Sequence, residues 1–238
     1  DCAPNIVPQP EWFLYRETLA LGQERQESGV AVLMVVAGLM LIAGTTFAGA
    51  DWASGSMSNQ LLFQPRRAKV WVAKGGAVFL SALVCSAVII AGFWVVLYLA
   101  AQLRGIDTGA AVQEQIRWIT ARGTLLASLG AVGGYALTML LRHTVGTLAV
   151  LFAYAAGGSA LIAALPFAGA GRWSVANNVL AWVQDGYAYY DASICSPRGD
   201  VCGREVRMTL EQGATYLGVL LLGVLLVSLV MFRRRDVP

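Results

Sequence analysis

Five long runs without a charged residue constrain the fold of this chain more than any other feature. They lie at about 30–50, 75–101, 123–141, 144–165 and 214–232, and none contains Asp, Glu, Lys, Arg or His. A helix needs roughly 20 apolar residues to cross the hydrocarbon core of a bilayer. The runs therefore predict an all-α membrane protein, a polytopic helical bundle with five visible transmembrane helices.

Buried helices of a water-soluble protein are the alternative interpretation of these runs. Such helices would need a polar shell, but only 13% of the residues are charged, against about 25% in a typical soluble domain. The mean hydropathy of +0.62 also favours a membrane protein. The segments between and around the spans are then 1–29, 51–74, 102–122, 142–143, 166–213 and 233–238.

The distribution of basic residues predicts which of these segments face the cytoplasm. Segments 51–74, 142–143 and 233–238 together hold eight Lys/Arg and two acidic residues, whereas the other three hold nine Arg and twelve acidic residues. Basic residues in short loops beside the spans mark the cytoplasmic side. We therefore expect the N-terminus of this chain outside the cell and its C-terminus in the cytoplasm. A protein that starts in the cytoplasm needs one more span before Asp1, which gives six.

Three of the four cysteines fall in the segments that we expect outside the cell, where disulfides persist. Turn-forming residues separate Cys195 from Cys202, so these two are the preferred candidate disulfide. Pairing of Cys2 with either one stays open, because spacing does not determine connectivity. Cys85 lies within a span and is interpreted as a packing residue.

Residues for catalysis and ion coupling are scarce in this chain. One histidine, His143, cannot build the usual zinc sites with scattered cysteines, so we expect no metal site and no catalytic residue. No P-loop is present, and therefore the chain itself does not bind ATP by that route. Ion-coupled transporters place ionisable residues within the membrane. Because these spans have none, the free energy for uphill transport must come from elsewhere. A partner on the cytoplasmic side that hydrolyses ATP, with ATP and Mg²⁺ bound in that partner, is the simplest source.

The segment 51–74 combines a short amphipathic helix with a basic return to the membrane. Ser56 or Ser58 can cap a helix in which Met57, Leu61 and Leu62 form one apolar face. Pro65 ends this helix, and basic residues that can meet lipid phosphates follow it. The helix could lie on the bilayer surface or dock into a groove of a soluble partner, and the physical argument alone does not choose.

The order of residues in this segment resembles the ABC-2 type permease family. An acidic residue and Trp precede Gly-Ser, then Leu-Leu, then Pro-Arg-Arg and a Lys that opens the next span. The matching residues are Asp51, Trp52, Gly55, Ser56, Leu61, Leu62, Pro65, Arg66, Arg67 and Lys74. The C-terminal Phe232–Val237 is also similar, and the resemblance covers roughly residues 30–238.

This resemblance implies a six-span, type V exporter-like permease half whose first span is absent from this chain. Its partners would be an ABC ATP-binding subunit, a second permease subunit, identical or homologous, and membrane lipid, with no nucleic acid. Segment 51–69 would be the coupling region, and Met57 would belong to it.

Two further features bear on a substrate path and an outer gate. Ser174 can cap a helix whose Val175, Val179, Trp182 and Val183 share one face. The aromatic residues of 166–213 are either anchors at the outer headgroups or part of a short re-entrant helix that forms an outer gate, and the ABC-2 resemblance favours the re-entrant helix. Glycine spacing in Gly44–Ala48 and Gly130–Gly134 favours close helix packing. The polar side chains available within the spans are Tyr135, Thr138, Tyr154, Ser159 and Tyr216. They line a path for a hydrophobic or amphipathic substrate or bond to neighbouring helices.

The hypothesis that follows is the permease subunit of an ATP-driven ABC exporter in a bacterial plasma membrane. The substrate would be a drug, lipid or glycolipid, and the chain would not be an enzyme by itself. The alternative is a membrane scaffold that presents its outer loops to partners without transporting anything.

Overall fold

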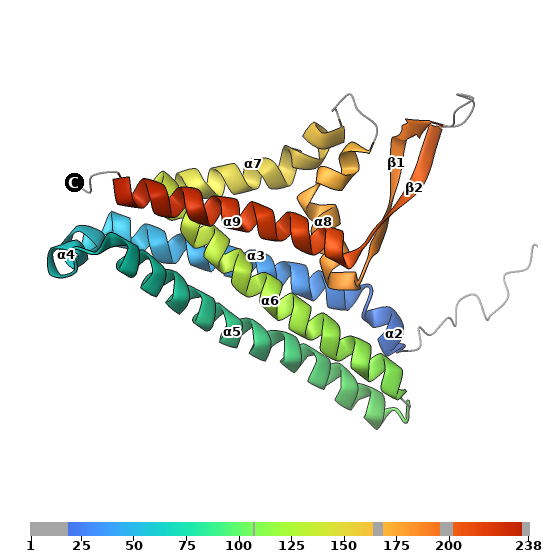
Figure 1. Ribbon diagram of the computed structural model, residues 1–238. Helices are drawn as coiled ribbons and strands as arrows, with labels where there is room; N and C mark the ends of the chain where they lie inside the picture. Colours follow the sequence, from blue (N-terminus) through green and yellow to red (C-terminus); the bar gives the residue numbers. More distant parts are fainter. Residues whose placement is uncertain (1–18, 107, 164–168, 196–201, 235–238) are drawn as a thin grey trace, which may run out of the picture.

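The computed structural model describes residues 19–106, 108–163, 169–195 and 202–234 (Figure 1). Cys2 and most of the N-terminal segment 1–29 therefore lie outside the described residues. The elements in chain order are α2 (Leu21–Glu24), α3 (Ser28–Ala53), α4 (Ser56–Phe63), α5 (Arg67–Leu103), α6 (Ala110–Leu141), α7 (Thr144–Ala163), η2 (Ala170–Trp173), α8 (Val175–Gln184), β1 (Tyr187–Cys195), β2 (Cys202–Met208) and α9 (Leu210–Arg234).

The fold is that of a helical membrane protein. Among the described residues, four helical stretches are long and apolar enough to cross a bilayer: Leu21–Ala53, Arg67–Leu103, Ala110–Leu141 and Leu210–Arg234. The fifth expected span coincides with α7, which is not one of these four helices and counts, over Thr144–Gly158, as a shorter apolar helix. These helices confirm the prediction of a polytopic helical bundle, whereas the β1–β2 hairpin is an addition that an all-α chain would lack.

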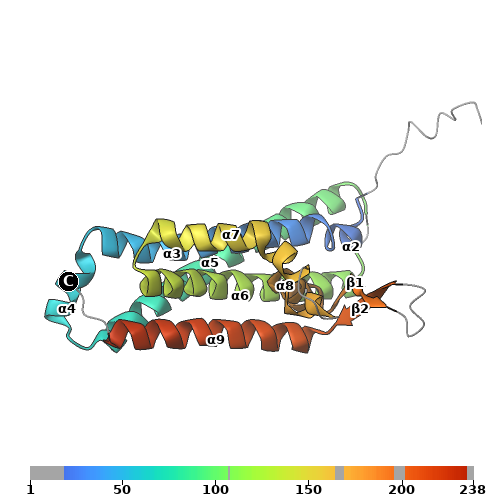
Figure 2. The ribbon, with the colours of Figure 1, turned by 90° about the horizontal axis from the view of Figure 1, so that it is seen from above.

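The long helices run side by side along one axis, with distinct structures at the two ends of the bundle (Figures 1 and 2). At one end lie α4, the α6–α7 turn and the last residues of α9, and we call this the elbow end. At the other lie α2, the α5–α6 connection, α8 and the β-hairpin, and we call this the hairpin end. Helix α6 contacts α3, α5, α7 and α9 and is the centre of the bundle.

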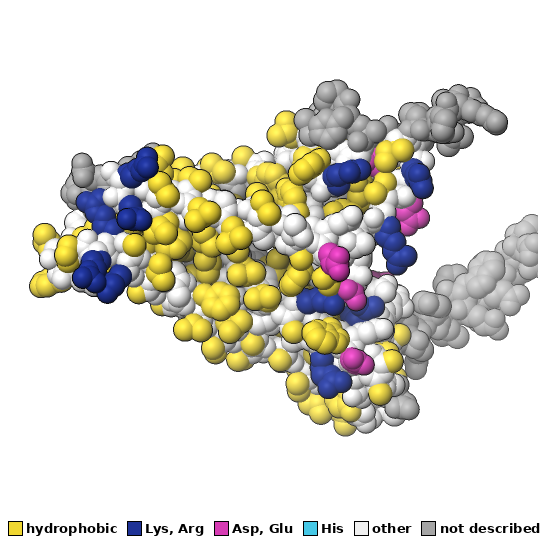
Figure 3. All heavy atoms as spheres, viewed as in Figure 1, with side chains coloured by type: hydrophobic (Ala, Val, Ile, Leu, Met, Phe, Trp, Pro, Cys, Tyr) yellow, Lys and Arg dark blue, Asp and Glu magenta, His cyan; other side chains and the backbone are white. Residues whose placement is uncertain are grey.

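Side-chain types are sorted along this axis. The face in Figure 3 shows a hydrophobic middle, Lys and Arg gathered at the elbow end, and both signs of charge at the hairpin end. Among the described residues of the elbow end, Asp51 is the one acidic side chain. An apolar band between two charged ends is typical of a membrane-spanning protein, because lipid tails surround the band and headgroups and water surround the ends.

Close packing between α3 and α6 is the basis of the core and confirms the prediction from glycine spacing. A Cβ on Gly44 would lie 2.0 Å from the carbonyl oxygen of Ala131, and one on Gly134 would lie 2.4 Å from that of Leu41. Only glycine allows the two backbones to approach so closely. Nearer the hairpin end of the α3–α6 contact, the Leu33 side chain of α3 fills the space beside Gly123 of α6.

Helices α5 and α6 extend further than the uncharged runs indicated. The segment 102–122, expected as a loop, is helical from Ala110 onward, and α5 begins at Arg67 within the expected cytoplasmic segment. Hydropathy marks where a helix enters lipid rather than where it begins. Ile119 is buried on the polar half of α6, so an amphipathic stripe continues the helix beyond the apolar run.

The segment expected as a loop at 166–213 contains two elements. Helix α8 follows Ser174, as predicted, although the Ser174 side chain makes no capping bond. Strands β1 and β2 then form an antiparallel hairpin in which Tyr187 faces Met208, Tyr189 faces Val206 and Cys195 faces Cys202. Tyr189 and Met208 pack on Ala181 of α8. Burial and then the Asp191 carboxylate raise the pKa of the Tyr189 phenol, and Arg172 opposes them.

Candidate functional site

The elbow end is the candidate functional site, because it contains every residue predicted to couple the chain to a partner. Helix α3 ends at Ala53, and α4 begins after Gly55, whose φ of +67° is left-handed. Glycine adopts this conformation without steric cost, and it lets the chain reverse within two residues. After α4, Gln64 is extended and Pro65 lies two residues before the start of α5.

Helix α4 buries one side and exposes the other. Met57 is 1% exposed, and Leu61 packs against the buried cluster that includes Trp71, Tyr135 and Phe232. Leu62 and Phe63, in contrast, are 81% and 85% exposed. The prediction of one apolar face with Met57, Leu61 and Leu62 is therefore wrong for Leu62, because i+5 on a helix lies about 140° from i. The result is a helix with a docked side and an exposed apolar edge.

Asp51 joins three elements at this elbow. One carboxylate oxygen pairs with the Lys74 ammonium at 2.5 Å, and the other accepts a bond from the Ser56 hydroxyl at 2.9 Å. The Lys74 and Asp51 side chains are only 14% and 17% exposed. Ser56 or Ser58 was expected to cap α4, but α4 has Gly55 at its N-cap and no side-chain cap. The Ser56 hydroxyl instead binds α4 to the end of α3.

Trp52 occupies the space between the α6–α7 turn and α9. The guanidinium of Arg142 lies 4.8 Å from the centre of the Trp52 ring, and the ring of Phe232 meets it edge-on at 6.4 Å. Arg142 has a φ of +57°, which ends α6 and makes the predicted two-residue turn with His143. A cation over a Trp face is an attractive contact, so the turn is held against α3.

A buried chain of hydrogen bonds connects the first turns of α5 to α6 and α9. The Tyr135 hydroxyl donates to the Trp71 carbonyl at 2.9 Å, and the Trp71 indole N–H donates to the Ser228 hydroxyl at 3.3 Å. Ser228 in turn donates to the Ala136 carbonyl at 2.7 Å. Satisfied polar networks in an apolar interior give the packing a single arrangement.

The remaining predicted coupling residues stand at the surface. Pro65 and Arg66 are exposed and Arg67 is half-buried, and they lie just after the apolar edge of α4. The structure therefore divides eight of the ten predicted residues into an inward group, Asp51, Trp52, Ser56, Met57 and Leu61, and an outward group, Leu62, Pro65 and Arg66. Gly55 forms the exposed turn before α4, and Arg67 is half-buried. Sequence reasoning missed Phe63, the most exposed apolar residue of α4, although it directly follows the Leu-Leu pair.

Four of the five polar side chains predicted for a substrate path are described by the structure, and these four do not come together. Tyr135 and Thr138 are fully buried near the elbow end, and Thr138 donates to the Gly134 carbonyl one turn back. Tyr154 and Tyr216 lie towards the hairpin end. The side chain of Ser159 lies outside the part of the chain that the structure describes. Tyr135 and Thr138 therefore bond within the bundle.

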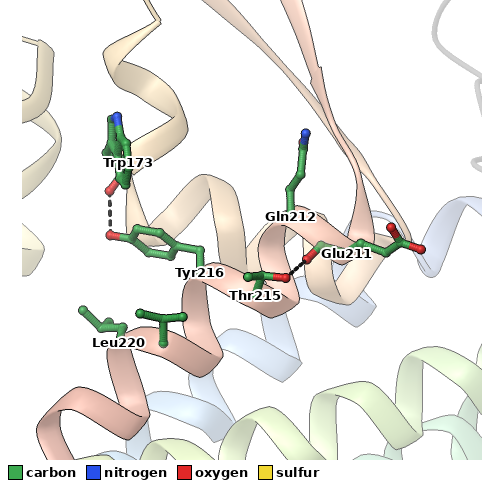
Figure 4. A pocket seen from close by; sticks show the side chains of 7 residues that line it. Trp173, Glu211, Gln212, Thr215, Tyr216 and Leu220 are labelled. Carbon is green, nitrogen blue, oxygen red and sulfur yellow. Dashed lines mark hydrogen bonds between the residues drawn. The ribbon is translucent and has the colours of Figure 1, made fainter.

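The two tyrosines near the hairpin end hold the segment before α8. The Tyr216 hydroxyl of α9 donates to the Trp173 carbonyl at 2.7 Å, and the Tyr154 hydroxyl of α7 accepts a bond from the Val175 N–H at 3.2 Å. Figure 4 shows Tyr216 directed at Trp173, while the Glu211 side chain extends away from both. A pocket of about 610 Å³ is lined by Trp173, Glu211, Gln212, Thr215, Tyr216, Val219 and Leu220.

The predicted disulfide has a backbone basis but no direct observation. Cys195 and Cys202 are register partners in the hairpin, and their side chains lie outside the described part of the structure. Within the described residues no group of three or more His, Cys, Asp or Glu side chains is placed to hold a metal.

The chain matches no family model, no curated protein and no solved structure. The geometry of the two ends of the bundle is therefore the basis on which a function is proposed.

Proposed function

We propose that this chain is the membrane-spanning permease subunit of an ATP-driven exporter of the ABC-2 type. The observation that carries the proposal is the exposed apolar edge of α4, Leu62 and Phe63, on a helix whose other side is packed into the bundle. A large exposed apolar pair at a rim of basic residues is typical of a surface that a partner covers.

In this proposal the elbow end faces the cytoplasm. The excess of Lys and Arg there supports this orientation, and the hairpin end is then outside. Helix α7 is proposed as the fifth span, because its 20 residues correspond to about 30 Å of helix. The plasma membrane of a bacterium is the proposed location, as the family resemblance implies.

The partner is proposed to be an ABC ATP-binding subunit that carries ATP and Mg²⁺. Its groove would receive Leu62 and Phe63, with Arg66 at the rim of the contact. When the ATPase closes on nucleotide, it would push α4, and the helices attached to α4 would shift between inward-facing and outward-facing packings. Nucleotide binding changes the equilibrium only if the ATPase contacts one packing better than the other.

A second permease subunit, identical or homologous, completes the proposed exporter. The proposed substrate is hydrophobic or amphipathic, such as a drug, lipid or glycolipid. The pocket beside Trp173 and Tyr216 supports this class, because its lining combines apolar Val219 and Leu220 with polar Gln212 and Thr215. A small ion would find no charged path through the uncharged spans.

Purification in a mild detergent tests this proposal. The natural chain should retain an ATPase subunit with a P-loop, and replacing Leu62 and Phe63 together by Asp should reduce the retained ATPase at least about tenfold, because two buried apolar side chains contribute roughly 3–6 kcal/mol. Neither residue packs in the bundle, so the chain should remain folded. Leu62→Met with Phe63→Met keeps the edge apolar and should retain the ATPase.

Two results would contradict the proposal. One is a natural chain that transports its substrate with no associated ATPase. The other is retention of the ATPase by the double Asp variant. Recovery of a non-ATPase protein bound through the exposed hairpin would favour the scaffold function instead, since β1 and β2 project from the bundle (Figure 1).

A further inference from the structure

Asp51 lies where a carboxylate is unfavourable for its own helix. It is in the last turn of α3, and the C-terminal end of a helix carries partial negative charge, which favours cations. Both of its oxygens are used by other elements: Lys74 of α5 takes one and Ser56 of α4 takes the other. Its position is therefore explained by these contacts rather than by the stability of α3.

We infer that Asp51 and Lys74 form a clamp that makes α4 rigid with α3 and α5, and that this clamp transmits movement of α4 to the bundle. Asp51 then acts inside the chain as a positioning residue and does not contact the partner. The inference rests on the proposed function for the source of the movement, but the clamp itself does not depend on the identity of any partner.

The connections at the two ends of α4 show why a clamp is needed. Gly55 precedes α4 in a left-handed conformation, and a Cβ built on it would meet nothing within 4 Å. Gln64 and Arg66 are non-helical on the other side. Met57 and Leu61 anchor one side of this eight-residue helix, but the two connections leave its ends able to turn about that anchor when pushed. The Lys74–Asp51–Ser56 contacts close this loop and prevent that turning.

The clamp also leads to a path into the bundle. Lys74 lies one helical turn after Trp71, whose carbonyl and indole bond to Tyr135 of α6 and Ser228 of α9. A displacement of α4 that carries Lys74 must therefore either carry α6 and α9 along with α5 or break these buried bonds. Leaving buried polar groups unpaired is costly, so the helices should move as a unit.

The clamp is tested by hydrogen exchange on the purified full chain in lipid nanodiscs. Asp51→Asn and Lys74→Gln should each speed exchange of the α4 amides at least about tenfold, because each leaves a part-buried partner without its counter-charge. The double variant should be no faster than either single variant, since the two residues share one interaction. Asp51→Glu keeps the carboxylate and should stay near the natural rate. Arg234→Gln removes an exposed charge at the same end and should have no effect.

A second measurement uses the complex with its ATPase and asks whether the clamp transmits movement. Asp51→Asn leaves Leu62 and Phe63 intact, so ATPase retention should be unchanged. The change in exchange of α8 at the hairpin end on addition of ATP and vanadate should be lost, and Asp51→Glu should restore it. A purely stabilising role for Asp51 would not abolish this change while retention persists.

Unchanged α4 exchange in both single variants would overturn the clamp. Additive effects in the double variant would also overturn it, because they would show two independent interactions. Faster α4 exchange with an intact response of α8 would overturn the transmission of movement and leave the proposed function standing. Absence of any associated ATPase would overturn the proposed function together with the transmission, whereas the nanodisc result would still decide the clamp.

Discussion

At the scale of single residues, glycines on α3 determine how closely this helix approaches α6. Gly44→Ala would place a Cβ 2.0 Å from the Ala131 carbonyl oxygen, so the backbones would have to separate. Overpacking of this kind costs about 1–3 kcal/mol. We expect that loss in the free energy of unfolding, measured by denaturant titration in mixed micelles.

Gly38 provides the matched control for this substitution, because it lies on the same helix and a Cβ there meets nothing within 4 Å. Gly38→Ala should be neutral or slightly stabilising, since Ala favours helix. Equal stability of the two variants would show that α3 and α6 do not pack through Gly44. The sequence identified this close-approach surface from its spacing, but spacing does not name the partner helix.

At the scale of elements, the hairpin makes a specific prediction for the cysteines. Cys195 and Cys202 face each other across antiparallel strands, where opposite Cβ atoms lie about 4.5–5.5 Å apart and a disulfide needs only a small adjustment. Peptide mapping of the unreduced protein should recover a Cys195–Cys202 linked pair, with Cys85 as a free thiol. The thiol of Cys85 is exposed on the bundle and has no facing cysteine among the described residues.

Pairing of Cys2 with Cys195 or Cys202 would give a different disulfide-linked peptide in the map. A peptide that joins Cys2 to Cys195 or Cys202 would contradict the hairpin disulfide, and a Cys2→Ser variant would then lose the cross-link. With the hairpin disulfide, Cys2→Ser should leave the map unchanged. The Cys2→Ser variant also separates a natural disulfide from reshuffling during purification, because reshuffling would produce a mixture of linked peptides.

The elements differ in how far the sequence predicted them. Uncharged runs located the long apolar helices because lipid excludes charge at every position of a span. The hairpin was missed because Tyr189, Tyr190 and Asp191 show no alternation of apolar and polar residues, and because they lie in a segment judged by its turn residues. The outward position of the Leu62 side chain was also missed. A short helix is oriented by its contacts rather than by its composition, and here the contacts are those of Met57 and Leu61 with the bundle.

Asp51 and Lys74 show the same limit within the candidate site. Both were recognised as members of one ordered motif, but they lie 23 residues apart, and the motif contains nothing that pairs them. The pair exists because α4 reverses the chain at Gly55 and returns it beside the end of α3. Contacts that depend on such a reversal require the tertiary structure.

At the scale of the whole molecule, the sorting of charge along the bundle axis determines a topology that can be measured. The elbow end carries Arg66, Lys69, Arg142 and Arg233 with Asp51 as its one described acid, and this excess opposes translocation. Green fluorescent protein fused after the last residue should therefore fluoresce. Alkaline phosphatase at the same site should be inactive, because it needs disulfides that form outside the cytoplasm.

Gly105, in the connection between α5 and α6, tests the opposite face. It is an exposed turn residue with φ +68°, and a Cβ there meets nothing within 4 Å, so an insertion should leave both helices in place. Phosphatase inserted there should be active and the fluorescent protein dark. The reverse pattern at both sites would show that the molecule has the opposite orientation in the membrane. The exposed edge of α4 would then face away from cytoplasmic ATP, and no cytoplasmic ATPase could reach Leu62 and Phe63.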